Sequence, residues 1–255
     1  MCLAFMMLGQ FENFPTVLLF NRDETYTRPT EPLKVHVLGK DIFWVGGRDL
    51  EKGGTWAGVN HQGRFGMITF YREPRCKKSP ARARGELVPG FLLGNEEPSE
   101  FLSKLEASAS DYLGFNLILG DSKKCFHYCN LGGGITKLEK GIFGVSNANL
   151  ESPWFKVTQG KKAISELASK EAFDAQSYFT ILADTQEAPR EQVQKTGLAY
   201  DYERLRSPLF VQAKTYGTRS SSIIYFDSNS KVTFEERTYG DSSKVFEERR
   251  FSFTV

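Results

Sequence analysis

The chain has 255 residues, of which 40% are hydrophobic and 25% are charged, and its formal net charge is +2. This length and composition are typical of an ordinary soluble globular protein, and we interpret residues 1–255 as a single domain. The small net charge gives no electrostatic reason to expect binding to nucleic acid or to an anionic membrane.

The first segment is apolar but carries no basic region before it, and it is interrupted by Gly9, Glu12 and Pro15. These features argue against a secretory signal peptide. No apolar run approaches the roughly 20 residues that a transmembrane helix needs. We therefore expect no transmembrane segment, and a protein that is cytoplasmic or soluble within an organelle.

Two short apolar runs, Cys2–Leu8 and Thr16–Phe20, open the chain. They are apolar at nearly every position, which is typical of strands buried on both faces. The turn-forming residues between them predict an antiparallel hairpin. In that pairing Cys2 lies opposite the far end of the second strand, where Asn21-Arg22-Asp23-Glu24 follows. This polar cluster is either a solvated strand end or a set of side chains held against a pocket.

The next segment, Thr25–Leu33, contains Pro29 and Pro32 and is predicted to cross the surface rather than form a central strand. Helices are predicted near Arg84–Leu93, at Pro98–Ala107, and from Pro153 to about Leu182 with an interruption around 169–172. Further strands are predicted at Ile42–Val45, Thr55–Val59, Phe65–Tyr71, Phe115–Leu119, Cys125–Cys129, Ile142–Val145, Ser222–Phe226, Lys231–Thr238 and Val245–Phe253. Strands that alternate with paired helical blocks favour an α+β sandwich of sheets covered by helices over a doubly wound fold.

The four cysteines and three histidines match neither a zinc pattern nor a secreted disulfide framework. We expect no metal site and no required cofactor. A basic stretch from Arg72 to Arg84 is either a site for phosphates or acidic surfaces, or a solvated loop that leads into a helix.

Cys2 is the candidate nucleophile of the chain. If Met1 were removed, this residue would carry both a thiol and a free α-amine, whose pKa of about 7.7–8.0 suits a general base near neutral pH. A nucleophile and a general base on the same terminal residue are the catalytic arrangement of the terminal-nucleophile hydrolases. The alternative is a small apolar residue at the start of a buried strand.

A series of short blocks in order along the chain resembles the family named for its NRDE tetrapeptide, the transport and Golgi organisation family. The blocks are Met1-Cys2, Asn21-Arg22-Asp23-Glu24, Arg28-Pro29, Gly53-Gly54-Thr55-Trp56-Ala57-Gly58, Arg84-Gly85-Glu86-Leu87, Gly114-Phe115-Asn116-Leu117, Ser146-Asn147-Ala148, Pro153-Trp154 and Tyr216-Gly217-Thr218-Arg219-Ser220-Ser221.

That family in turn resembles N-terminal-nucleophile hydrolases of the choloylglycine hydrolase type. The resemblance implies an αββα four-layer sandwich, with Cys2 as nucleophile and Arg22 and Asp23 as the residues that hold and polarise it. It further implies Asn147 as an amide near the oxyanion and Arg219 as a second pocket arginine. The related groups usually have an asparagine where this chain has Phe70. Without that donor, hydrolysis would lose roughly 10²–10³ in rate.

The family is associated with the handling of heme and of acyl-coenzyme A or acyl lipids, and with Golgi and mitochondrial phenotypes. The resemblance therefore implies a small amphipathic anionic ligand, with heme as cargo rather than resident cofactor, and possible places in the mitochondrion or at the Golgi. Arg22 and Arg219 suit carboxylates or phosphates. The predicted ligand-binding residues are Asn21, Glu24, Trp56, Phe70, Asn116 and Trp154. The alternative function is an N-terminal cysteine amidohydrolase or thioesterase.

Overall fold

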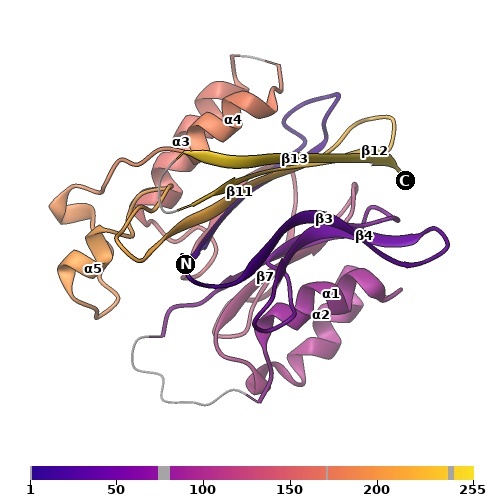
Figure 1. Cartoon of the computed structure of the whole chain (residues 1–255), viewed down its shortest axis with the longest axis horizontal. Coiled ribbons are helices and arrows are strands. Elements are labelled where there is room, and N and C mark those ends of the chain that lie inside the picture. Colours follow the sequence, from indigo (N-terminus) through magenta and orange to yellow (C-terminus); the bar gives the residue numbers. More distant parts are fainter. Residues whose placement is uncertain (1, 74–80, 171, 241–243) are drawn as a thin grey trace.

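A computed structural model describes residues 2–73, 81–170, 172–240 and 244–255. Two antiparallel sheets lie face to face, and helices cover the outer face of each (Figure 1). This arrangement confirms the four-layer αββα sandwich that the sequence predicts. No helix among the described residues is both long enough and apolar enough to cross a bilayer.

The first sheet has six strands in the order β10-β1-β2-β11-β12-β13. Their bounds are β1 (Cys2–Leu8), β2 (Thr16–Thr25), β10 (Gly141–Val145), β11 (Tyr216–Phe226), β12 (Lys231–Tyr239) and β13 (Val245–Thr254). Its outer face packs against α3 (Phe155–Ala168) and α4 (Ala175–Leu182).

The second sheet has seven strands in the order β3-β4-β5-β6-β7-β8-β9. Their bounds are β3 (Thr30–Gly39), β4 (Ile42–Asp49), β5 (Ala57–Asn60), β6 (Phe65–Phe70), β7 (Phe115–Gly120), β8 (Cys125–Cys129) and β9 (Gly134–Leu138). Its outer face packs against α1 (Leu87–Leu93) and α2 (Pro98–Glu106). The short elements are η1 (Arg84–Glu86), η2 (Ala109–Asp111), η3 (Arg190–Gln192) and α5 (Tyr200–Arg204).

Strand β1 shows how the apolar runs build the core. Because side chains alternate between the two faces of a strand, Phe5 and Met7 pack under the helices, whereas Ala4 and Met6 pack between the sheets. Every residue of β1 is buried. The continuous apolar run thus contributes side chains to two hydrophobic cores, which confirms the prediction of a strand buried on both faces.

The structure differs from the sequence predictions around residues 21–33. Strand β2 continues through Asn21-Arg22-Asp23-Glu24 instead of ending at Phe20, because β1 and β11 pair with it on both sides. The predicted surface excursion is wrong for Thr30–Leu33, which begins β3. This strand lies at the edge of its sheet, and its register shifts between Glu31 and Lys34, which accommodates Pro32.

Strand β9, helix α5 and the first half of β11 are further elements that the sequence did not predict. Part of the basic stretch, with Cys76, Arg75, Lys77 and Lys78, lies outside the described residues.

Candidate functional site

The β1–β2 hairpin places Cys2 directly opposite Arg22 in the sheet register. Both side chains point away from the helices, into the space between the two sheets. A second contact fixes the start of β1, because the hydroxyl of Ser146 donates a hydrogen bond to the Cys2 carbonyl at 2.8 Å. The first described residue of the chain is therefore part of the wall of the site.

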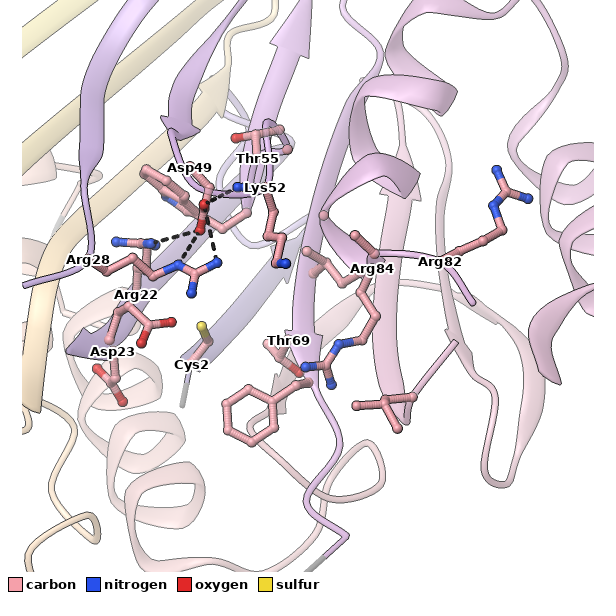
Figure 2. A pocket seen from close by; sticks show the side chains of 18 of the residues that line it. Cys2, Arg22, Asp23, Arg28, Asp49, Lys52, Thr55, Thr69, Arg82 and Arg84 are labelled. Atoms are coloured by element: carbon pink, nitrogen blue, oxygen red, sulfur yellow. Dashed lines mark hydrogen bonds and ion pairs between the residues drawn. The ribbon is translucent and has the colours of Figure 1, made fainter. Parts of the chain in front are cut away.

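A pocket of about 510 Å³ opens where the strand ends of the two sheets meet. Figure 2 shows Cys2 in its middle, with Arg22 and Asp23 on one side and Thr69 and Arg84 on the other. The sequence-predicted residues that line it are Cys2, Arg22, Asp23, Glu24, Trp56 and Phe70. The pocket thus gathers residues from β1, β2 and β6 and from the loop before β5.

Arg22 is held in a fixed position at the pocket wall. Its guanidinium lies 4.2 Å above the Trp56 ring, donates to the Thr30 hydroxyl at 3.1 Å, and is 3.5 Å from a carboxylate oxygen of Asp49. Asp49 also accepts two hydrogen bonds from Arg28, at 2.7 and 3.2 Å. Burial disfavours the ionised form of Asp49, but the hydrogen bonds from Arg28 and the Lys52 amide and the charges of Arg28 and Arg22 together outweigh it, so the pKa of Asp49 is lowered.

Two further cations, Lys52 and Arg84, face the pocket opposite Arg22 (Figure 2). Neither forms an ion pair with any of the residues that the structure describes. Arg84 donates to the carbonyl of Gly114 at 2.7 Å, and its guanidinium lies 5.4 Å from the centre of the Phe70 ring. Sequence reasoning did not select these two residues, although both adjoin or open blocks that carry the family resemblance.

Burial raises the pKa of the Cys2 thiol, the nearby Asp23 carboxylate acts in the same direction, and the Arg22 charge opposes both. A thiol with a raised pKa is mostly protonated near neutral pH, so its reactivity depends on the charges placed around it. The electrostatic partners of Asp23 therefore matter for the chemistry of Cys2.

Asp23 lies on β2 next to Arg22 and makes contacts toward the helical layer. One of its oxygens accepts a hydrogen bond from Thr218 at 2.7 Å, and the other lies 3.5 Å from the ammonium of Lys156 on α3. Lys156 is missing from the sequence-predicted site. Its neighbours Phe155 and Val157 are apolar, and only the fold shows that its charge is buried against Asp23.

The other sequence-predicted residues do not line the pocket. The amide of Asn147 donates to the carbonyl of Phe70 at 2.8 Å, which holds the end of β6. Arg219, at a register shift in β11, donates to the carbonyls of Thr25 and Arg28 at 2.8 and 3.2 Å. Both side chains thus support the backbone around the pocket.

The three remaining predicted residues also make contacts outside it. Asn21 donates to the carbonyls of Leu182 and Leu209, which ties β2 to the helical layer. Asn116 donates to Thr69 at 3.3 Å and lies 2.9 Å from a ring nitrogen of His127. Trp154 precedes α3, and its ring centre is 5.5 Å from the guanidinium of Arg72. The described residues include no group of three or more His, Cys, Asp or Glu placed to hold a metal ion.

Comparison with known proteins shows which family the whole chain resembles. The model of the family described as Transport and Golgi organisation 2 matches residues 1–241. The Transport and Golgi organization 2 homolog of Mus musculus is 34% identical, over 94% of this chain and 92% of that protein. The homolog of Homo sapiens is 31% identical over the same shares.

Among solved structures, a mutant of the conjugated bile acid hydrolase from Clostridium perfringens superposes with a TM-score of 0.55. The match covers 98% of this chain and 92% of the hydrolase, at 8% sequence identity. The likeness therefore concerns the fold, which is that of the N-terminal-nucleophile hydrolases.

Proposed function

The chain belongs to the Transport and Golgi organisation 2 family, and we propose that its Cys2 pocket binds and carries an amphipathic anionic ligand, either heme or an acyl-coenzyme A or related acyl lipid. This proposal rests mainly on one observation, which is that the two cations Lys52 and Arg84 line the pocket. These cations face a pocket of about 510 Å³ and have no carboxylate partner among the described residues.

The chemistry of the walls supports the same class of ligand. Guanidinium and ammonium groups recognise carboxylates and phosphates, which are the polar ends of heme and of acyl-coenzyme A. Apolar surface for a porphyrin or an acyl chain comes from four lining residues, which are Trp56, Ile68, Phe70 and Leu113. The volume lies within the range of roughly 300–1,000 Å³ that is usual for small-molecule sites.

A titration tests the proposal. Hemin, followed by its absorbance, and palmitoyl-coenzyme A, followed by calorimetry, are titrated into the wild type and into a Lys52→Gln/Arg84→Gln double variant. We expect saturable binding of at least one ligand, weakened about tenfold or more in the variant, since hydrogen bonds to charged groups contribute about 1.5–3 kcal/mol.

The matched control is Arg190→Gln, which removes an exposed arginine outside the pocket. It should leave both titrations unchanged. Binding that never saturates, or that weakens equally in the control, would refute the proposal. A Cys2→Ala variant, titrated with hemin, shows whether the thiol itself contacts the ligand.

The fold favours a second candidate, an N-terminal cysteine amidohydrolase or thioesterase that uses Cys2. The conjugated bile acid hydrolase shares the fold, and Cys2 lines the pocket here as a hydrolytic nucleophile would. Against it, Phe70 stands where related groups usually have an amide, and Asn147 donates to the Phe70 carbonyl. This arrangement favours the carrier over the hydrolase.

Intact-mass measurement separates the two candidates. The free-amine mechanism requires a species without Met1, so a homogeneous protein that keeps this residue excludes it. If Met1 is absent, an electrophilic acyl probe should label Cys2 ahead of every other cysteine, and turnover of an acyl substrate should disappear in Cys2→Ala.

A further inference from the structure

Lys156 is a buried cation in the helical layer, directly behind the strand that pairs with Cys2. It belongs to the first turn of α3, and its side chain has no solvent-exposed surface. Its ammonium lies 3.5 Å from a carboxylate oxygen of Asp23, whose side chain is equally buried. The same nitrogen makes no hydrogen bond with any described residue. Lysine is almost never fully buried unless it is paired, so the complete burial of the Lys156 ammonium needs an explanation.

The position of Asp23 connects this lysine to the pocket. Asp23 follows Arg22, the residue paired with Cys2, and it lines the pocket together with Cys2. Its other oxygen is held by the Thr218 hydroxyl at 2.7 Å, and that hydroxyl accepts from the Val211 amide at 2.9 Å. The carboxylate is therefore clamped between β11 and α3, at the back of the site.

We propose that Lys156 is a positioning residue of the Cys2 site. As a fixed, buried cation 3.5 Å from the Asp23 carboxylate, it offsets part of that group's negative charge, so that a thiolate at Cys2 forms beside a more nearly neutral pair. The inference rests on the proposed function only in treating the Cys2 pocket as the functional site. It holds equally for a ligand-carrying and a hydrolytic pocket.

The physical reason is the low polarity of the interior. An unpaired charge there acts strongly on its neighbours, whereas a close ion pair largely cancels at a distance. The other charged groups that act on Cys2, Asp23 or Lys156 come from several elements. Among the described residues they are Arg22 of β2, Arg72 after β6, Arg84 of η1 and Arg206 after α5. Removing Lys156 leaves all of them in place, so its effect can be isolated.

The test measures the thiol itself and needs no ligand, so its failure is distinguishable from failure of the proposed function. The rate of alkylation of Cys2 by iodoacetamide is followed between about pH 6 and 10, by mass spectrometry of the peptide that contains Cys2. We expect Lys156→Met to slow alkylation near neutral pH by about three- to tenfold and to move the pH profile upward. Asp23→Asn should react at the wild-type rate or faster.

The decisive variant is Asp23→Asn/Lys156→Met, which removes both charges. We expect its rate to return to within about twofold of wild type, because two groups in contact act non-additively. The matched control, Lys162→Met, neutralises an exposed lysine of the same helix and should change nothing. If Lys156→Met does not fold, Lys156→Gln keeps a polar side chain of similar length and replaces it.

Three results would overturn the inference. One is an unchanged rate and pH profile in Lys156→Met. Another is a double variant as slow as the single one, which would mean that Lys156 acts without Asp23. The third is faster alkylation of Cys2 at every pH in Lys156→Met. That result would mean that Lys156 has only a structural role and that its loss makes Cys2 more accessible to iodoacetamide.

Discussion

Neighbouring residues of β2 serve different layers of the molecule because a strand sends alternate side chains to opposite faces. Arg22 points between the sheets, where it stacks on Trp56 and faces the pocket. Asn21 points to the helices and hydrogen-bonds the carbonyls of Leu182 and Leu209. The polar motif Asn21-Arg22-Asp23-Glu24 therefore contains side chains that line the pocket and side chains that anchor β2 to the helical layer. Substitutions of the first kind should affect the pocket, and substitutions of the second kind should affect stability.

His127 illustrates the cost of a titratable group in the interior. Burial lowers its pKa to about 4, from an ordinary value of 6.5, and its ring lies 2.9 Å from the Asn116 side chain. Between these two values the unfolded chain takes up a proton that the folded chain does not. The histidine's contribution to stability is thus present above pH 6.5 and is lost as the pH falls toward 4.

We predict that His127→Gln, which does not titrate, reduces this acid sensitivity. The free energy of unfolding, measured in urea at neutral pH and near pH 4.5, should fall by about 2–3 kcal/mol more in wild type than in the variant. Equal losses in the two proteins would show that another group sets the acid response.

At the scale of elements, two glycine loops bring the walls of the pocket together. Gly54 and Gly85 both line it, and the amide of Thr55 donates to the Gly85 carbonyl at 3.1 Å. A Cβ on Gly54 would lie 2.3 Å from that carbonyl oxygen, closer than any real contact. Because Gly85 follows Arg84, the spacing of these loops also positions one of the two pocket cations that form no ion pair with a described residue.

Gly54→Ala should force the loops apart and weaken ligand binding by several-fold or more, with a loss of stability of about 1–3 kcal/mol. The hemin and palmitoyl-coenzyme A titrations and a thermal melt check both effects. Gly240→Ala is the control, because a Cβ there meets nothing within 4 Å. Unchanged affinity in Gly54→Ala would mean that the ligand does not touch this part of the pocket.

The elements that could be predicted are those whose signal is local. The apolar runs of β1 and β2 and the turn between them gave the pairing of Cys2 with the NRDE segment. The end of β2 and the edge strand β3 could not be read in the same way, because polar residues and Pro32 are tolerated there only through pairing with distant strands. Sequence reasoning did not select Lys156 as a site residue for a similar reason, because its partner Asp23 lies 133 positions away along the chain.

At the scale of the whole molecule, a buried carboxylate connects the two sheets. Glu236 on β12 accepts a hydrogen bond from the backbone amide of Leu33, at the register shift of β3, at 2.7 Å. It also accepts from the Ser222 hydroxyl at 3.2 Å. Burial raises the pKa of Glu236 above its ordinary 4.5, although these hydrogen bonds oppose the shift. Its contribution to stability is therefore fully present below pH 4.5 and is lost as the pH rises through the raised value.

Glu236→Gln keeps an oxygen for the Leu33 amide but cannot ionise. We predict that the unfolding free energy of wild type, relative to this variant, decreases as the pH rises from about 4.5 to 8. Urea unfolding at several pH values measures the difference, with Glu12→Gln, at an exposed position, as the control. A difference that stays constant over this range would rule out ionisation of Glu236 as the cause.

Every described residue that lines the Cys2 pocket falls between positions 2 and 113, yet the sheet that carries Cys2 and Arg22 also needs β11, which begins at Tyr216. A ribosome that has translated the first half of the message has made these lining residues but not the strand that closes the open edge of β2. A premature stop codon before position 216 should thus leave an aggregation-prone edge, and the product should be recovered in the insoluble fraction of the cell. Late nonsense mutations would then be as damaging as early ones.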